Sequence, residues 1–158
     1  MFNLQEHVSV LLPILQHFLT NAPRKAEYDA ARQNIVVVVG SLARHLDRDD
    51  ARVKPIVAKL IESLSTPSAQ VQQAVADCLP PLVPYIKEEA PGLVKKLLQL
   101  LLGSGNFGER KGAAYGLAGL VKGLGILSLK QLDIMTTLSD AIQNKKNQSH
   151  REGEFECC

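Results

Sequence analysis

The sequence predicts an all-α solenoid of about three and a half stacked helix pairs, and two observations point to this fold class. First, the chain repeats itself: segment 71–83 aligns without gaps with segment 109–121, and a looser copy begins forty residues upstream, at Ala31. Second, the apolar residues within each repeat recur with helical spacing rather than with the alternation of a strand. A period of about forty residues is typical of helical repeats that bury their apolar faces against one another.

The first helix of each repeat carries a broad apolar stripe. Positions 56, 57, 60, 61 and 64 hold only Ile, Val or Leu, and so do the positions 37 residues later. This spacing places all five side chains of a repeat on one face of a helix. Pro13, Pro55 and Pro91 fall in the first turn or two of these helices, where a missing N–H is tolerated.

Two stretches in the second helices need separate interpretation. Residues 35–39 read Ile-Val-Val-Val-Val and would favour a strand if they were taken alone. Their register within the repeat predicts a helix instead. Pro80 and Pro81 fall inside another second helix, which they are expected to kink or to end early.

The pattern predicts seven helices, which lie at about Leu4–Leu19, Glu27–Leu46, Ala51–Leu64, Ser68–Lys87, Glu89–Leu102, Phe107–Leu124 and Leu129–Gln143. They form an array over residues 1–144, with repeats at about 4–46, 51–87 and 89–125 and a lone helix at 129–143. Residues 145–158 are expected to be a polar tail that starts a truncated repeat at His150. Neither end carries a polar capping repeat, so the chain is interpreted as a slice of a longer array.

Composition excludes several classes of protein. A net charge of +2 is too small to indicate general nucleic-acid binding, and no apolar run approaches the length of a membrane span. The three cysteines form no disulfide framework, and the four histidines do not cluster with cysteines or paired carboxylates. Cys78 falls on an apolar helix stripe and is expected in the core. A reduced intracellular setting, with no metal and no cofactor, is the economical interpretation.

Residues 103–108 satisfy the G-x-G-x-x-G pattern and open a helix, which leaves a nucleotide-dependent enzyme as one hypothesis. A dinucleotide site needs a strand before the glycines and an acid about twenty residues after them. Here a helix precedes the glycines, and residues 125–129 hold no acid. The motif therefore predicts a turn between helices. Backbone N–H groups at the start of the next helix, with Arg110 and Lys111, could still hold a phosphate.

The second helices open with a V-R-x-x-A type motif, and this motif, the paired helices and the early prolines resemble HEAT repeats. The arginine column of that family falls on Arg32, Gln72, Arg110 and Arg151, so position 72 departs from the pattern. We expect Arg32, Gln72 and Arg110 to form a structural ladder, in which the arginines pair with carboxylates or carbonyls between neighbouring repeats.

Residues 105–125 carry a closer resemblance, to the general-control translational activator family. These are very large HEAT scaffolds that stimulate the starvation-responsive kinase of the initiation factor 2 alpha subunit. The resemblance extends over residues 1 to about 153. It implies a non-catalytic, cytoplasmic scaffold segment that binds the ribosome or regulatory proteins of the kinase pathway, without a small-molecule substrate. A HEAT adaptor for transport, phosphatase or chromatin complexes is the alternative.

Basic residues are scattered over the repeats, and most are expected on solvated helix faces. The candidate patch for a protein partner or for ribosomal RNA comprises five residues that the expected hairpin brings near one another: Lys95, Lys96, Arg110, Lys111 and Lys122. Phosphate contacts from such a patch would weaken as salt is raised. No nucleophile, base and orienting group occur together in a pattern that indicates catalysis.

The interpretation of the glycine motif as a turn predicts that nucleotides do not stabilise the chain. Addition of ATP, GTP or NAD is expected to leave the melting temperature unchanged in a thermal-shift assay, because a ligand raises it only by binding the folded state. A rise that depends on nucleotide concentration would contradict the interpretation.

Overall fold

The computed structural model describes the backbone of residues 4–155 and the side chains of residues 6–145. All regular elements in this part of the chain are helical, which confirms the all-α fold class. Contacts divide the chain into two compact units, one up to Leu124 and one from Gly125 onward.

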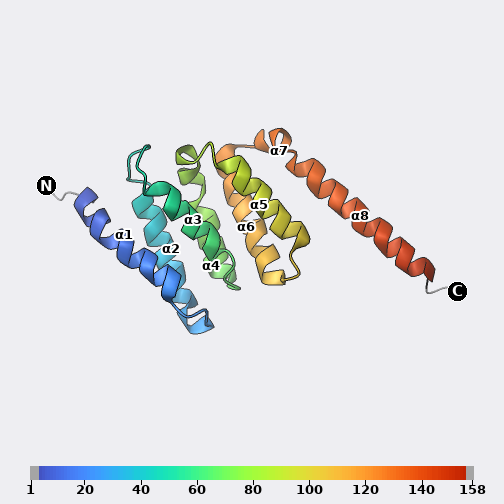
Figure 1. Ribbon diagram of the computed structural model, residues 1–158, viewed down its shortest axis with the longest axis horizontal. Helices are drawn as coiled ribbons and strands as arrows, with labels where there is room; N and C mark the ends of the chain where they lie inside the picture. The colour runs from blue at the N-terminus through green and yellow to red at the C-terminus, as the bar shows by residue number, and fades with distance from the viewer. Residues whose placement is uncertain (1–3, 156–158) are drawn as a thin grey trace. The chain divides into compact units, whose positions relative to one another are not determined.

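The first unit consists of three helix pairs (Figure 1), and the elements lie at α1 Leu4–Asn21, α2 Asp29–Ala43, α3 Val53–Ser63, α4 Ala69–Cys78, α5 Ala90–Gly103 and α6 Phe107–Leu124. Two short 3₁₀ helices, η1 at Ala26–Tyr28 and η2 at Pro80–Tyr85, join them. The second helices of the pairs pack in sequence, α2 on α4 and α4 on α6, and α5 packs on α6. The core between them is aliphatic, with fully buried side chains at Val36, Ile56, Leu60, Leu79, Leu82, Leu97 and Leu120.

The repeat register correctly predicted the segments with ambiguous local signals. Residues 35–39 lie inside α2, so packing of the repeat overrides the strand propensity of the valines. The glycine motif forms the end of α5, a turn, and the start of α6.

The expected interruption at the double proline is confirmed. The α-helix α4 ends at Cys78, and residues 80–85 continue as the 3₁₀ helix η2. The prolines have no N–H for the α-helical hydrogen bonds, so the chain tightens instead of continuing. Leu82 and Val83 remain buried, and η2 packs on α6.

Helix α6 approaches the preceding repeat along a strip of four glycines, Gly112, Gly116, Gly119 and Gly123. Their spacing of four, three and four residues places them on one face. A Cβ atom at Gly112 would overlap the carbonyl oxygen of Leu64, and one at Gly119 would lie 2.7 Å from the carbonyl oxygen of Ala76. Both obstacles are backbone atoms. Helix α6 can therefore come this close to Leu64, at the end of α3, and to Ala76 of α4 only because positions 112 and 119 carry no side chain.

The second unit contains α7 Ser128–Gln131 and α8 Ile134–Phe155, which corrects the expectation of a lone helix at 129–143. The helix is broken at Leu132 and Asp133, where Asp133 adopts a φ of 50°. Helix α8 then continues well beyond residue 143, because residues 144–152 contain neither proline nor glycine.

The described part of the expected polar tail, residues 145–155, is therefore the end of α8, and no second helix starts separately at His150. Residues 156–158 lie outside the described residues. Among the helices of the described chain, none combines the length and the apolar character needed to cross a lipid bilayer.

The glycine strip predicts opposite effects for two Gly→Ala substitutions. Gly112→Ala should lower the free energy of unfolding by about 1–3 kcal/mol, because the added methyl group meets a backbone carbonyl that cannot move aside. Gly92→Ala in α5 should leave it unchanged or raise it by up to about 1 kcal/mol, since nothing lies within 4 Å of the new Cβ and alanine favours the helix. Chemical denaturation of both variants tests this, and equal effects would contradict the close contact.

Candidate functional site

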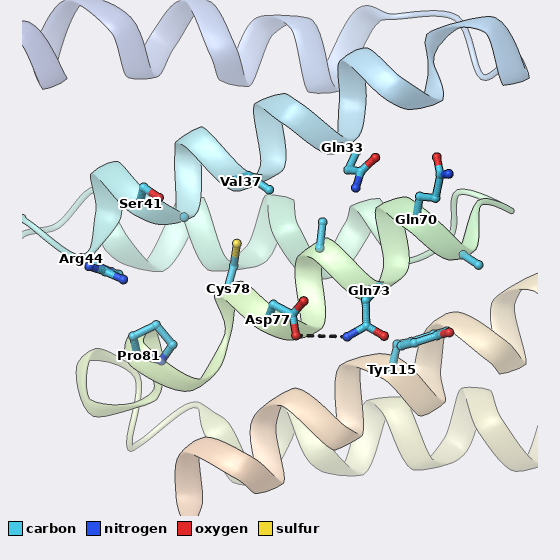
Figure 2. A pocket seen from close by; sticks show the side chains of 13 residues that line it. Gln33, Val37, Ser41, Arg44, Gln70, Gln73, Asp77, Cys78, Pro81 and Tyr115 are labelled. Carbon is cyan, nitrogen blue, oxygen red and sulfur yellow. Dashed lines mark hydrogen bonds between the residues drawn. The ribbon is translucent and has the colours of Figure 1, made fainter.

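A groove of about 650 Å³ lies along the face formed by α2, α4 and α6, with η2 at one end (Figure 2). Its polar lining consists of Gln33, Ser41, Arg44, Gln70, Gln73 and Asp77. Its larger apolar groups are Val37, Cys78, Pro81 and the ring of Tyr115. The groove therefore combines an apolar floor with mostly uncharged polar groups.

Small residues let the helices form this groove. Gly40 of α2 lies directly against Cys78 of α4, where a Cβ would overlap the thiol. Ala69 and Ala74 on α4 add little bulk above the floor. Helices α2 and α4 consequently pack closely, and the longer side chains beside the contact enclose a hollow.

The groove residues recur from repeat to repeat. With the offsets of 40 and 38 residues, Gln33, Gln73 and Lys111 occupy equivalent positions on α2, α4 and α6. One helical turn later, the equivalent residues are Val37, Asp77 and Tyr115. Residues four apart share a helix face, so on each helix the polar residue and the residue four positions later point to the same side.

The amide groups of the groove are largely available for a ligand. Gln73 donates a hydrogen bond from Nε2 to Asp77 Oδ1 at 3.0 Å, which leaves the Oε1 atom of Gln73 as an acceptor. The side chains of Gln33 and Gln70 make no hydrogen bond to any described residue, and neither does the Tyr115 hydroxyl. These amides and this hydroxyl can both donate and accept.

Cys78 is half-buried in the groove wall rather than enclosed in the core, contrary to the sequence-based expectation. The double proline ends α4 at this residue, so no further helical turn covers it. Its thiol faces the Val36 carbonyl oxygen at 3.6 Å. Burial is the main cause that raises the pKa of the Cys78 thiol to about 11, with a smaller contribution from the nearby charge of Asp77 and an opposing one from Arg44. The thiol is therefore protonated at neutral pH.

The structure places the three residues of the expected ladder beside loop carbonyls. Arg32 Nη2 donates to the Ala22 and Pro23 carbonyl oxygens, at 2.6 and 2.8 Å, and Arg110 Nη1 donates to the Ser104 carbonyl oxygen at 2.7 Å. Both arginines thus hold the loop of their own repeat.

Gln72 also reaches the next repeat. Its Nε2 atom lies 3.1, 3.0 and 3.0 Å from the carbonyl oxygens of Leu64, Thr66 and Gly108. The Gly108 contact belongs to the following pair, so among these three residues Gln72 is the one whose hydrogen bonds cross between repeats.

The five residues of the candidate basic patch have different surroundings. Lys111 and Lys122 are exposed on the same stripe of α6 as Tyr115, about 16 Å apart along the helix. Lys96 lines a different hollow of about 310 Å³, between α3 and α5, together with Glu62 and Glu109. Lys95 is exposed on α5.

Arg110 is half-buried, and its guanidinium lies 5.8 Å from the centre of the Phe107 ring. The sequence indicated that the start of α6 could hold a phosphate, but the backbone N–H groups there already have a side-chain cap. Asn106 Oδ1 accepts hydrogen bonds from the N–H groups of Gly108 and Glu109, and the Ser104 hydroxyl donates to Glu109 Oε2 at 2.6 Å. A phosphate there would compete with the Asn106 cap and meet the charge of Glu109.

A second hollow, of about 580 Å³, lies at the loops that join neighbouring repeats, and three of its charged residues, Asp50, Lys54 and Glu89, are engaged in ion pairs. Lys54 forms an ion pair with Glu89. Arg52 donates hydrogen bonds to both carboxylate oxygens of Asp50, which lowers the pKa of Asp50 to about 2. These groups hold the loops together and offer less to a ligand than the groove amides.

Comparison with known proteins identifies the repeats. Residues 4–44 match the family described as the HEAT repeats of the stalled ribosome sensor GCN1. The human "Stalled ribosome sensor GCN1" is 65% identical over 149 residues, which cover 94% of this chain and 6% of that protein. The chain belongs to the HEAT-repeat family.

The similarity of this HEAT chain extends to distant organisms. Arabidopsis thaliana "Protein ILITYHIA" is 47% identical over 97% of the chain, and the "eIF-2-alpha kinase activator GCN1" of Saccharomyces cerevisiae is 40% identical over 93% of it. The chain matches one segment of these proteins, since it spans only about 5–6% of their length. No solved structure matches the chain.

Sequence reasoning missed the groove of this HEAT segment because its residues form no binding motif, although several of them lie in the aligned repeat segments 71–83 and 109–121. The signal was present in the repeat alignment, where Gln33, Gln73 and Lys111 are polar at one position of three successive second helices. Only the packing of α2 against α4 shows that the first two of these residues, Gln33 and Gln73, line a hollow.

The raised pKa predicts that Cys78 reacts slowly with thiol reagents. At pH 8 about one thiol in a thousand would be ionised, given a pKa of about 11. In a variant with Cys157 and Cys158 replaced by Ser, alkylation by iodoacetamide should be much slower in the folded chain than in urea. Similar rates in both conditions would show that Cys78 is not shielded.

Proposed function

We propose that this chain is a non-catalytic interaction segment of a GCN1-type scaffold, which acts in the cytoplasm in translational control. The observation that carries this proposal is 65% identity to the human stalled ribosome sensor over 94% of the chain. Relatives from Dictyostelium discoideum and Saccharomyces cerevisiae are named as activators of the eIF-2-alpha kinase. The proposed partners are accordingly the ribosome and regulatory proteins of the starvation-responsive kinase pathway.

The chemistry of the groove supports a binding role. Its polar groups include three amides, which are neither acids nor bases at neutral pH. The pKa of about 11 keeps the Cys78 thiol protonated and a weak nucleophile. Amides above an apolar floor are suited to holding a partner chain by hydrogen bonds and contact area.

Contact with ribosomal RNA is a narrower part of the proposal. Of the five patch residues, Lys111 and Lys122 are the best placed, because both are exposed on one stripe of α6. Arg110 already donates to a loop carbonyl, and Lys96 lies near Glu62 and Glu109. We therefore propose Lys111 and Lys122 as the main contacts and Lys95, Lys96 and Arg110 as peripheral ones.

Ribosome co-sedimentation at two salt concentrations tests the proposal. The chain should sediment with purified ribosomes at low salt and less so at high salt, because phosphate contacts release counterions. Lys111→Glu with Lys122→Glu should reduce the bound fraction at least fivefold.

The matched control is Lys25→Glu with Lys87→Glu, which makes the same change in net charge at two other exposed positions. An equal loss in the control would assign the effect to overall charge and remove the role of α6. Absence of the unmodified chain from the ribosome pellet at low salt would refute direct ribosome contact.

A further inference from the structure

We propose that the groove on the α2–α4–α6 face binds an extended polypeptide segment in the polyproline II conformation. The segment crosses the three helices, is uncharged over α2 and α4, and carries acidic side chains over α6. This inference rests on the proposed scaffold function, because it specifies the form of the protein partner.

The spacing of the helices matches the period of such a peptide. Packed helices lie about 8–10 Å apart, and α2, α4 and α6 pack in sequence. A polyproline II chain rises about 3.1 Å per residue with three residues per turn, so the same face returns about every 9 Å. A peptide of this form therefore meets equivalent positions on successive helices at each turn. In a β-strand the same face returns about every 7 Å, out of step with the helices.

The amide side chains match the needs of its backbone. A polyproline II chain forms no internal hydrogen bonds, so its carbonyl groups require external donors. Gln33 on α2 and Gln70 on α4 offer Nε2 groups that make no hydrogen bond to described residues. Figure 2 shows both side chains at the same end of the groove as Gln73 and Tyr115. The Oε1 atom of Gln73 adds an acceptor for any N–H group of the peptide.

The floor of the groove suits apolar side chains such as proline. The apolar side chain of Val37 is 46% exposed, and it lines the groove. Pro81 and the half-buried ring of Tyr115 extend this surface toward η2 and α6. An occupant that covers these groups removes apolar area from water without displacing a charge.

The charges around the groove determine which part of the bound segment carries acidic side chains. Over α2 and α4 the groove holds one cation, Arg44, and one anion, Asp77, which offset each other. On α6, Lys111 and Lys122 flank Tyr115 along one stripe and have no ion pair with a described residue. Acidic side chains are thus favoured over α6 alone. The charge of Asp77 and the presence of one aromatic ring make the groove poorly suited to RNA, which needs a basic track and stacking surfaces.

Binding of synthetic peptides to the 158-residue chain tests this inference by fluorescence anisotropy. The probes are two labelled twelve-residue peptides, each with three Pro-Pro-Gln triplets and one Pro-Glu-Glu triplet. The Pro-Glu-Glu triplet stands at the N-terminus of one peptide and at the C-terminus of the other. Two further peptides have Lys in place of Glu. At least one acidic peptide should bind, and its lysine counterpart should bind at least tenfold more weakly. A labelled twelve-residue oligouridine should bind no better than the lysine peptides.

Substitutions locate the site. Gln73→Ala with Tyr115→Ala should weaken binding of the acidic peptide at least tenfold, whereas Lys111→Glu should reverse the preference between Glu and Lys peptides. Gln99→Ala is the control, since Gln99 is an exposed glutamine on α5, outside the groove. Circular dichroism of each variant confirms that it is folded.

Three results would overturn the inference: no binding by either acidic peptide, equal binding by Glu and Lys peptides, or binding of oligouridine that Gln73→Ala with Tyr115→Ala abolishes. The proposed function is judged separately. A chain that sediments with ribosomes but binds no peptide would refute the groove and leave the scaffold role standing. A chain that binds the peptide but not ribosomes would support the groove and refute direct ribosome contact.

Discussion

The direct contact of helix α6 with the backbone of the preceding repeat is the constraint on which the rest of the structure depends. Four glycines bring α6 against the end of α3, against α4 and against η2. This contact sets the distance between successive second helices and thereby the spacing of the side chains that border the groove. Leu117 and Leu120, which lie together on one side of the strip, are both buried.

Hydrogen bonds to loop carbonyls hold the loop inside each repeat, and one of them, from Gln72 to the Gly108 carbonyl oxygen, also joins two repeats. The carbonyl oxygens at the end of each first helix and its loop are acceptors without helical partners. Arg32 and Arg110 satisfy them with guanidinium donors, and Gln72 does so with a primary amide. Since the surroundings of Gln72 offer only acceptors, its Nε2 is used and its buried Oε1 accepts no hydrogen bond from a described residue. The departure from arginine at position 72 therefore keeps the donor and gives up the charge.

The repeat period made the fold predictable from the sequence, whereas the groove depended on information that a single sequence does not contain. Periodicity identified the helix pairs and overrode the local preference of residues 35–39, because every repeat supplies the same apolar face. It failed at the C-terminal end, where Asp133 breaks one expected helix and the next continues to Phe155. The groove arises from residues on three helices, and the contact of Gly40 with Cys78 that shapes it has no sequence pattern of its own. The basic residues showed the converse problem: they are easily found in the sequence, but their differing surroundings appear only in three dimensions.

The glycine strip also has a mechanical consequence. At Gly119 helix α6 meets the backbone of Ala76 in α4, and backbone atoms have no side-chain rotamers through which the contact can relax, so the α4–α6 contact should behave as a stiff element under load. The α2–α4 contact is mediated by the Cys78 side chain and should be more compliant. Tension along a long scaffold would then be taken up unevenly, with the width of the groove changing first between α2 and α4. In a longer array of such repeats, the groove of this segment would respond to stretching.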